Sequence, residues 1–364
     1  MEYQFFVSSA PHFSDKDTVQ KIMFDVVLAL LPAMAAAIYY FEGAAWVILV
    51  SIAACLATEA IVQKLLKKPI TISDGSALVT GILLAFNLPA GIPLWMPIIG
   101  AVFAIAIGKH AFGGLGYNPM NPALLGRAFL LASWPKEMTT FGALRDGTRA
   151  SGLLPDAFSS LVEKNPTLQQ FVDTITSATP LNAMKQAQDI VANSAAYVED
   201  KVTVATLVMN KLSDLDSYSE LFLGKVGGCL GETSVALLLL GALYLMYKRR
   251  IGWKIPFSYI GTVALLSWIF GGPDALLKGD ALFHALSGGL ILGAFFMATD
   301  MVTSPVTYWG RIIFGVGCGI ITVVIRLIGG YPEGVSYSIL LMNLTVPLID
   351  KFTKPRIFGE VKAK

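Results

Sequence analysis

Residues 77–84 read ALVTGILL, and residues 285–292 read ALSGGLIL in the other half of the chain. Each apolar run is followed further on by a Gly-Gly turn: FGGLGYNPMNPALL occupies 112–125, and IGGYPEGVSYSILL occupies 328–341. Chance similarity between segments rich in Leu and Gly is the alternative explanation. Because both motifs occur in the same order in both halves, we favour a true internal repeat.

The composition of the chain predicts that these repeats lie in a membrane. Of the 364 residues, 55% are hydrophobic and only 14% are charged, and the mean hydropathy is +0.64. Soluble domains carry about 25% charged residues, so this deficit favours an integral membrane protein in contact with lipid. The formal net charge is +2, without a basic stripe, so nucleic acid is not expected as a partner.

Ten apolar segments are candidates for transmembrane helices, which need about 20 mostly apolar residues. They form two groups of five, at 22–41, 44–63, 76–88, 95–109 and 120–134, and at 229–247, 255–271, 281–298, 310–328 and 335–350. With five spans in each half, the second repeat must be inverted relative to the first. The predicted fold is therefore an all-α polytopic membrane protein with two inverted five-helix repeats. Short or broken helices in such repeats place a binding site near the membrane midplane.

A polar stretch separates the two groups of spans and divides the chain into three parts. Residues 1–134 form the first transmembrane repeat, 135–225 an extramembrane segment, and 226–364 the second repeat. The N-terminus is polar and lacks the apolar core of a signal peptide.

Cations in the loops predict the orientation, because cytoplasmic loops are enriched in Lys and Arg. Three clusters follow the second, sixth and tenth spans: Lys64, Lys67 and Lys68; Lys248, Arg249, Arg250 and Lys254; and Lys351, Lys354 and Arg356. If all three are cytoplasmic, both termini are cytoplasmic and residues 135–225 lie outside. Arg326, near the outer end of the ninth span, runs against this pattern.

The stretch GGLGYNPMNPALLGR, residues 113–127, contains a predicted helix start at Asn121-Pro122. Asn accepts from free backbone N–H groups at a helix start, and Pro fits the first helical position. A break in the membrane must be covered by protein or line a cavity. This motif is therefore a candidate pocket for a polar planar ligand such as a flavin, with the residues Gly113, Gly114, Gly116, Asn118, Asn121 and Arg127. A structural re-entrant turn without a ligand is the alternative.

Several ionisable residues lie in or beside the predicted spans: Asp25, Glu59, Lys109, Arg127, Glu232, Asp300 and Arg311. Charges in spans are costly and tend to be functional or paired. We take Glu59, Glu232 and Asp300 as candidates for an ion pathway, with helix-end polar groups as the alternative for Glu59 and Glu232. For Lys109, and similarly for Arg127 and Arg311, we expect the charged head to reach the membrane interface.

Cysteine and histidine do not indicate a metal centre. Cys55, Cys229 and Cys318 lie far apart in apolar segments. They form no CxxC pair, so we expect buried structural thiols and no disulfide framework. The three histidines are too scattered to suggest haem ligation.

The stretch DTITSATPL, residues 173–181, lies in the polar segment. Locally, Thr179-Pro180 predicts the start of a helix. The residues Asp173, Thr176, Ser177, Ala178 and Thr179 also match the pattern D-x-x-(S/T)-(G/S)-A-T. This pattern resembles the recognition sequence of bacterial flavin transferases, which attach FMN to the last threonine through a phosphoester. One departure is Ser177, where the pattern usually has Gly.

Motifs that run nearly from end to end carry a wider resemblance. The chain resembles the D subunits of Rnf complexes, which are ferredoxin:NAD oxidoreductases, and more distantly the B subunits of sodium-pumping NADH:quinone reductases. The residues that carry it are DGSALVTGILLA (74–85), FGGLGYNPMNPALLGR (112–127), DTITSATPL (173–181), GAFFMATDMVTSPVT (293–307), GRIIFGVGCG (310–319) and GGYPEGVSYSILLMNLTVPLIDKFTKPR (329–356).

The resemblance implies an electron-transfer subunit of an ion-translocating oxidoreductase in a bacterial or archaeal cytoplasmic membrane. It implies covalent FMN on Thr179, attached by a separate flavin transferase, and non-covalent riboflavin near Asn118 and Asn121. The implied partners are the A, B, C, E and G subunits of such a complex. Electron flow between ferredoxin and NAD would be coupled to Na⁺ or H⁺ movement through residues such as Glu59, Glu232 or Asp300.

Two other classes of function remain open at this point. Inverted five-helix repeats also fit a transporter or channel without redox activity, because fold alone does not fix function. A third possibility is a scaffold that only holds neighbouring subunits.

Overall fold

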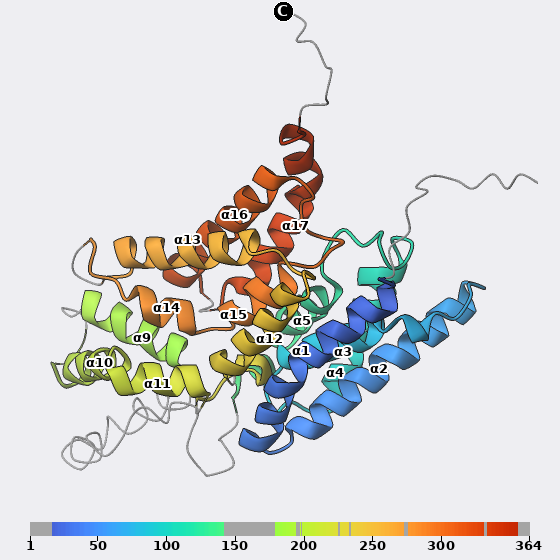
Figure 1. The fold of residues 1–364 in the computed structure, drawn as a ribbon. Coiled ribbons are helices and arrows are strands. Elements are labelled where there is room, and N and C mark those ends of the chain that lie inside the picture. Colours follow the sequence, from blue (N-terminus) through green and yellow to red (C-terminus); the bar gives the residue numbers. More distant parts are fainter. Residues whose placement is uncertain are drawn as a thin grey trace, which may run out of the picture.

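A computed structural model describes residues 17–141, 179–193, 197, 199–224, 226–232, 234–272, 276–330 and 333–355. Within these ranges the chain is helical and forms no β-strand, and an isolated bridge joins Pro89 and Cys229. Figure 1 shows the helices gathered into one assembly, with α3, α5 and α15 near its centre. The predicted all-α class is therefore confirmed.

The first half contains the helices α1 (Val19–Tyr40), α2 (Ala44–Leu65), α3 (Ser76–Phe86), α4 (Trp95–Val102), the π-helical η2 (Phe103–His110) that continues α4, and α5 (Pro122–Ser133). Of these, α1 and α2 are long and apolar enough to cross a membrane. Large apolar side chains on their outer faces are exposed, including Leu28 and Trp46. A water-soluble protein rarely exposes so much apolar surface, so these faces suit lipid.

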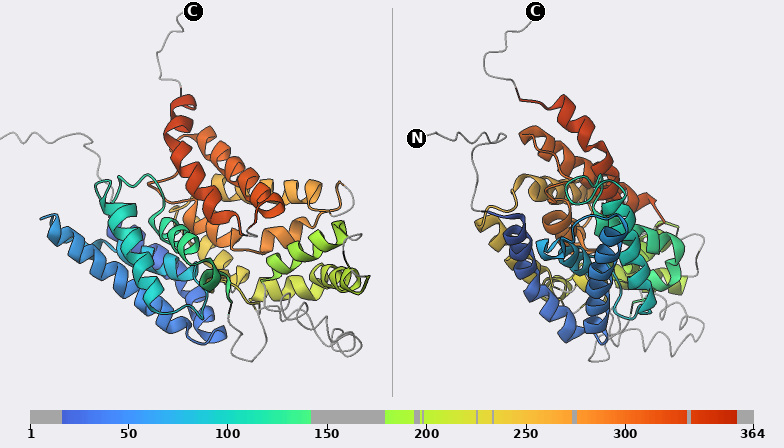
Figure 2. Two further views of the ribbon diagram at one scale, coloured as in Figure 1. Left: turned by 180° about the vertical axis from the view of Figure 1, so that it is seen from behind. Right: turned by 90° about the vertical axis from the view of Figure 1, so that its right-hand side faces the viewer.

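The second half contains α12 (Val235–Tyr247), α13 (Lys254–Phe270), α14 (Ala281–Leu286), α15 (Leu290–Leu292), the π-helical η6 (Gly293–Met297), α16 (Tyr308–Ile328) and α17 (Val335–Phe352). The helix α16 is the third one long and apolar enough to cross a membrane. It packs between α13 and α17. In the left view of Figure 2, teal helices of the first half lie between this orange-to-red group and the blue helices α1 and α2.

The predicted span at 281–298 is broken into the three pieces α14, α15 and η6. Gly288 and Gly289 separate the first two pieces at φ +69° and +66°, a left-handed conformation that glycine adopts without a steric cost. Arg326 of α16 donates from Nη1 to His284 O (2.5 Å) and from Nη2 to Ser287 O (2.9 Å). The guanidinium therefore satisfies backbone carbonyls at the end of α14 that have no partner within the helix.

Between the halves lie the short helix α6 (Pro135–Thr139) and the helices α9 (Pro180–Ala192), α10 (Glu199–Leu212) and α11 (Leu215–Leu223). Leu181, Ala187 and Val208 belong to a separate small core on α9–α11. Phe283 of α14 inserts into that core and is fully buried. The segment at 135–225 therefore contains a helical unit that is docked on the second half.

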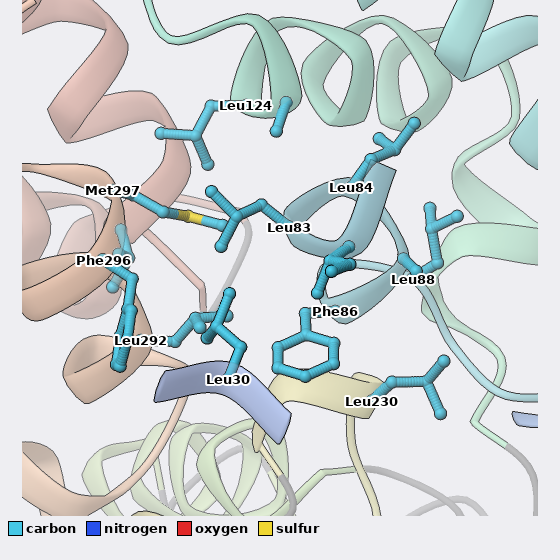
Figure 3. Packing of buried hydrophobic residues seen from close by; sticks show 14 of the residues in the cluster. Leu30, Leu83, Leu84, Phe86, Leu88, Leu124, Leu230, Leu292, Phe296 and Met297 are labelled. Atoms are coloured by element: carbon cyan, nitrogen blue, oxygen red, sulfur yellow. The ribbon is translucent and has the colours of Figure 1, made fainter. Parts of the chain in front are cut away.

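One large core joins the two halves. Leu30, Leu83 and Phe86 of the first half lie against Leu292 and Met297 of the second half (Figure 3). The three cysteines are free and buried, as predicted for structural thiols. In lipid no hydrophobic force drives helices together, so close packing of this shared core is what holds the two halves in contact.

Candidate functional site

The predicted helix start at Thr179-Pro180 is confirmed. Thr179 is the N-cap of α9, and its Oγ1 accepts from the Asn182 backbone N at 3.3 Å. Its side chain is only 2% exposed. The other residues of the attachment motif, Asp173, Thr176, Ser177 and Ala178, lie outside the described residues. The structure therefore gives the local geometry of the threonine but not of the motif before it.

A cleft between the halves, which we call the Asn118 cleft, is lined by residues from α1, α3, η2, α5 and η6. Apolar side chains such as Val79, Leu83 and Phe296 line most of it. Its polar lining consists of Ser76, Thr80, Lys109, Asn118, Asn121, Arg250, Thr299 and Asp300. An apolar cleft with a few convergent polar groups is the usual form of a ligand site.

The two asparagines of the NPMN motif reach this cleft in different ways. Asn121 is the N-cap of α5, and its Oδ1 accepts from the backbone N of Ala123 at 3.0 Å and of Leu124 at 3.3 Å. Asn118 donates from Nδ2 to Met120 O at 3.2 Å. Its buried Oδ1 has no hydrogen-bond partner among the described residues. A buried acceptor without a partner is costly, so Asn118 presents an acceptor that suits a ligand N–H group.

Asp300, from the far end of the sequence, lines the same cleft. It follows η6, and its carboxylate accepts from the Thr303 hydroxyl at 3.1 Å and from Val302 N at 3.4 Å. The fold thus brings Asn118, Asn121 and Asp300 together, although their separate sequence motifs suggested separate roles.

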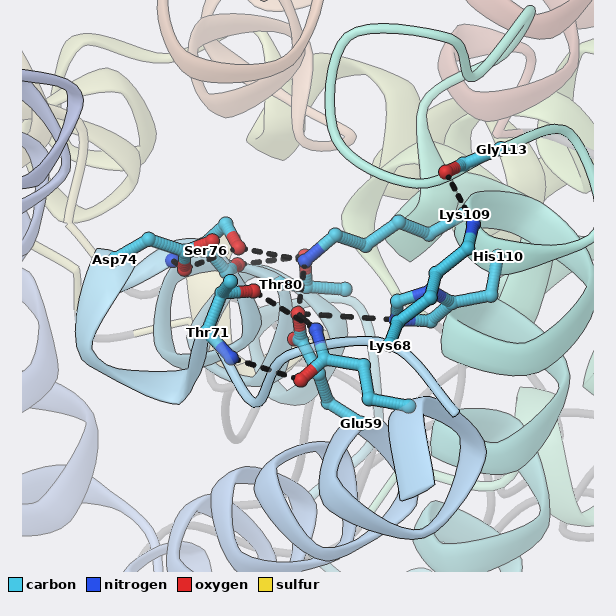
Figure 4. Close-up of polar contacts among 10 residues, drawn as sticks. Glu59, Lys68, Thr71, Asp74, Ser76, Thr80, Lys109, His110 and Gly113 are labelled. Atoms are coloured by element: carbon cyan, nitrogen blue, oxygen red, sulfur yellow. Dashed lines mark hydrogen bonds and ion pairs between the residues drawn. The ribbon is translucent and has the colours of Figure 1, made fainter. Parts of the chain in front are cut away.

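Beside the cleft lies a buried polar group that we call the Glu59 cluster (Figure 4). It comprises Glu59, Gln63, Ser76, Lys109 and His110. Lys109 Nζ lies 2.6 Å from Glu59 Oε1 and 2.6 Å from Ser76 Oγ. Gln63 Nε2 donates to Glu59 Oε1 at 3.1 Å. The expectation that Lys109 reaches the membrane interface is therefore wrong, because its side chain is 3% exposed and turned to a carboxylate.

A second cavity, the Glu59 cavity, opens on the other side of Lys109. Its wall includes Glu59, Gln63, Lys68, Thr71, Asp74, His110, Gly113 and Gly114. Lys109 and Leu115 line both this cavity and the Asn118 cleft. The glycines make the turn over it, with Gly113 at φ +127°, Gly114 at +113° and Gly116 at +93°. Lys68 donates to Gly113 O at 3.0 Å. The glycines predicted for the flavin pocket thus shape the Glu59 cavity and the turn above it.

A second buried group, the Arg127 cluster, comprises Asn87, Arg127, Cys229, Glu232, Glu333 and Ser336. Arg127 Nη1 donates to Asn87 Oδ1 and Ser336 Oγ, both at 2.9 Å. Its Nη2 pairs with Glu333 and contacts Cys229 Sγ at 3.6 Å. The expectation that Arg127 reaches the interface is wrong, since its side chain is 9% exposed. Arg127 lines neither of the two cavities described above.

Glu232, a predicted ion-pathway residue, belongs to the Arg127 cluster. Ligand atoms of Cys229, Glu232 and Glu333 all lie within 4.8 Å of one another. Arg127 already places a guanidinium against the Glu333 carboxylate, and a buried charge needs such a partner. The arrangement is therefore an ion-pair cluster, and it does not have the open, all-anionic ligand set that a metal ion would favour.

Sequence reasoning did not single out Gln63, Ser76, His110 or Glu333. Two of them carried a usable signal. His110 directly follows Lys109, and Glu333 lies in the second Gly-Gly motif, which corresponds to the motif that contains Asn118. Gln63 and Ser76 carried none, because they are common surface residue types whose burial depends on tertiary packing.

Taken together, the apolar helices, the shared core and the buried ion pairs define a multi-pass membrane protein with a cleft between its halves. The chain belongs to the NQR2, RnfD, RnfE family, whose model matches residues 6–359. The resemblance drawn from the sequence motifs is thereby confirmed.

Named relatives agree over nearly the whole chain. It is 46% identical over 361 residues, covering 98% of this chain and 96% of the relative, to the D subunit of the Na(+)-translocating ferredoxin:NAD(+) oxidoreductase complex of Acetobacterium woodii. It is 47% identical over 356 residues, with 98% and 96% coverage, to the D subunit of the proton-translocating ferredoxin:NAD(+) oxidoreductase complex of Clostridium ljungdahlii. To the D subunit of the ion-translocating oxidoreductase complex of Stutzerimonas stutzeri it is 41% identical over 351 residues, covering 94% of this chain and 93% of the relative.

Proposed function

We propose that this chain is the electron-transfer subunit of the D type in an ion-translocating ferredoxin:NAD oxidoreductase complex, in which other Rnf-type subunits are its partners. The observation that carries the proposal is the match of this chain to two such subunits over 98% of its length, together with an apolar cleft that has a few convergent polar groups. One of these relatives is named for Na⁺ and the other for protons, so the transported ion is left open.

The proposed topology has ten spans in two inverted repeats, with both termini in the cytoplasm and residues 135–225 outside. Each of the ten predicted spans contains helix, which supports the count. The helices α3 and α15 both begin after a left-handed glycine, Gly75 at φ +79° and Gly289 at φ +66°. Corresponding breaks in the two halves are typical of inverted repeats in transporters.

The Asn118 cleft fits a non-covalent flavin such as riboflavin. Its apolar walls suit the ring system, and the free Asn118 Oδ1 suits a ring N–H group. When bound, a flavin supplies electron transfer, while the protein supplies position, electrostatics and exclusion of water. Asn118 and Asn121 would hold its polar edge, and Phe295 and Phe296 would contact its apolar face.

The second proposed cofactor is FMN, linked through a phosphoester to Thr179 Oγ1 by a separate flavin transferase. The N-cap geometry of Thr179 supports this, because a helix N-terminus favours a bound anion. The side chain is 2% exposed, so a transferase would need to reach it before α9 packs fully. Ion movement would follow the electron steps through Glu59, Glu232 or Asp300, which lie respectively at the Glu59 cavity, in the Arg127 cluster and in the Asn118 cleft.

One gel tests the covalent cofactor. The chain is expressed together with a bacterial flavin transferase, denatured, and examined for flavin fluorescence in its band. The wild-type chain and Thr203→Ala, a matched threonine on the exposed side of α10, should fluoresce, and Thr179→Ala should not. A dark wild-type band whose intact mass lacks FMN would reject the covalent carrier and favour a transporter without redox activity.

A further inference from the structure

Lys109 forms part of the wall between two cavities. Its side chain lines both the Asn118 cleft and the Glu59 cavity. The ammonium is held by Glu59 Oε1 on one side and by Ser76 Oγ on the other, each at 2.6 Å, and Ser76 also lines the cleft. Lysine carries its charge on a flexible stem with three rotatable donors, so a small movement would turn the ammonium from one cavity to the other.

Glu59 would not stay charged without that ammonium. The residue is fully buried, and its Oε2 has no hydrogen-bond partner in the part of the chain that the structure describes. Burying a carboxylate without a counter-charge costs several kcal/mol, and the group takes up a proton instead. Among the described residues, Oε2 is the carboxylate oxygen without a partner, because Oε1 accepts from Lys109 and Gln63.

His110 lies between Glu59 and the Glu59 cavity as a neighbour of both. The ring is buried at 6% exposure, and its Nε2 lies 3.7 Å from Glu59 Oε1. Neither ring nitrogen has a hydrogen-bond partner within the described ranges, and His110 lines the Glu59 cavity. A neutral imidazole with two free nitrogens can accept a proton at one and release a proton from the other.

We propose that Lys109 couples the two cavities: negative charge gained in the Asn118 cleft draws the ammonium away from Glu59, and Glu59 then takes up a proton from the Glu59 cavity through His110. This inference rests on the proposed function, because it requires a flavin in the cleft. The electron comes from the ferredoxin-linked chain of the complex.

The balance is one proton for each electron. An electron that enters the cleft adds one negative charge, and one proton from the Glu59 cavity forms an O–H bond on Glu59, so the total charge of the two sites is unchanged. Reoxidation removes the electron, returns the ammonium to Glu59 and releases the proton. In an apolar interior two unit charges interact far more strongly than in water. The added negative charge in the cleft therefore attracts the Lys109 ammonium strongly.

Other charged or titratable groups face this pair and belong to the same balance. They are Cys55 on α2, Lys68 and Asp74 on the connection before α3, and Arg250 and Asp300 at the wall of the cleft. None of these lies between Lys109 Nζ and Glu59 Oε1, which are in direct contact. We therefore assign the coupling to Lys109 and Glu59.

The test is a redox titration of the cleft flavin from acid to alkaline pH. The full-length chain is purified from cells without a flavin transferase, so that FMN does not contribute, and its bound flavin is quantified first. In the wild type the midpoint potential should fall as pH rises. Lys109→Met should shift it to more negative values and flatten its pH dependence, and Lys109→Arg should restore the potential. Glu59→Gln should shift it to more positive values and also flatten the pH dependence.

Controls separate the possible outcomes. The double variant Lys109→Met/Glu59→Gln removes both buried charges and covers the case in which Lys109→Met does not fold. Lys351→Met, an exposed lysine at the end of α17, should match the wild type. If flavin is bound but the pH slope is the same in Lys109→Met, Glu59→Gln and the wild type, the coupling is rejected and the proposed function stands. If the wild-type chain binds no flavin, the cleft part of the proposed function is rejected, and the coupling falls with it.

Discussion

The Glu59 cluster and the Arg127 cluster are two buried sets of charges in one helical assembly, and they are built differently. Arg127 directs its two Nη atoms at four side chains, Asn87, Ser336, Cys229 and Glu333. The Glu59 cluster leaves Glu59 Oε2 and both His110 nitrogens without hydrogen-bond partners among the described residues, and it borders two cavities. In the same part of the chain, the Arg127 cluster also has one unpartnered atom, Arg127 Nε. The Glu59 cluster there leaves a carboxylate oxygen and two imidazole nitrogens unpartnered beside a cavity, where they have room to change their protonation.

The difference also concerns what each cluster connects. Arg127 of α5 reaches Ser336 of α17 and Cys229, which precedes α12, so its bonds cross from the first half to the second. The members of the Glu59 cluster all lie in the first half, on α2, α3 and η2. We conclude that the Arg127 cluster holds the halves in register, while the Glu59 cluster acts within one half.

The largest expected effect comes from Arg127→Met. It leaves Glu333 without its guanidinium, and breaking a buried pair in this way costs about 3–5 kcal/mol. Thermal unfolding of the purified chain in detergent measures the loss. Arg127→Met/Glu333→Gln should recover a large part of it, because one stranded charge is then removed. A single variant as stable as the wild type would contradict the holding role of the cluster.

Lys109→Met should cost less stability, and the cost should depend on pH. Glu59 borders a cavity from which it can take up a proton, so neutralisation limits the loss to about 1–3 kcal/mol, the penalty of an unsatisfied buried polar group. The stranded carboxylate is charged at high pH and neutral at low pH. The difference from the wild type should therefore shrink as pH falls, as measured by unfolding in detergent at several pH values. A loss independent of pH would remove the contrast between the two clusters.

The smallest effect concerns the cleft itself. Asn118→Ala removes one acceptor from the proposed flavin site, a loss of about 1 kcal/mol or about five-fold in affinity. The expected result is less extractable riboflavin with unchanged covalent FMN. Asn87→Ala serves as the matched control, because Asn87 belongs to the Arg127 cluster and should leave the riboflavin content unchanged. Equal riboflavin in both variants and the wild type would argue against Asn118 as a ligand.

Local chemistry made several features predictable from the sequence. Asn121 and Thr179 cap α5 and α9 as expected, since a cap depends on the residue itself and the next turn. Apolar runs located the helices, because burial in lipid or core needs apolar side chains over their whole length. The motif ALSGGLIL contains the Gly288-Gly289 pair that breaks the helix. The segment is also apolar enough over its length to be predicted as one continuous span.

The burial of the charged side chains and the identity of their ion-pair partners were not predictable from the sequence. Hydropathy gives the height of a residue along a span, but not the direction in which its side chain points. Lys109 pairs with a residue 50 positions away, and Arg127 with one 206 positions away. Such pairs exist only once the helices have packed. The contact of α9–α11 with Phe283 could not be predicted for the same reason, because no local sequence pattern indicates a contact between distant segments.

Arg326, whose guanidinium binds two carbonyls at the end of α14, has a consequence for the order in which the chain is built. A charged side chain in an apolar helix is costly in a membrane unless it finds partners, and Arg326 is 3% exposed in the finished assembly. Its acceptors lie at residues 284 and 287, so they leave the ribosome before it does. Because synthesis proceeds from the N-terminus, the segment that carries the two acceptor carbonyls is made before Arg326, its cationic partner on α16.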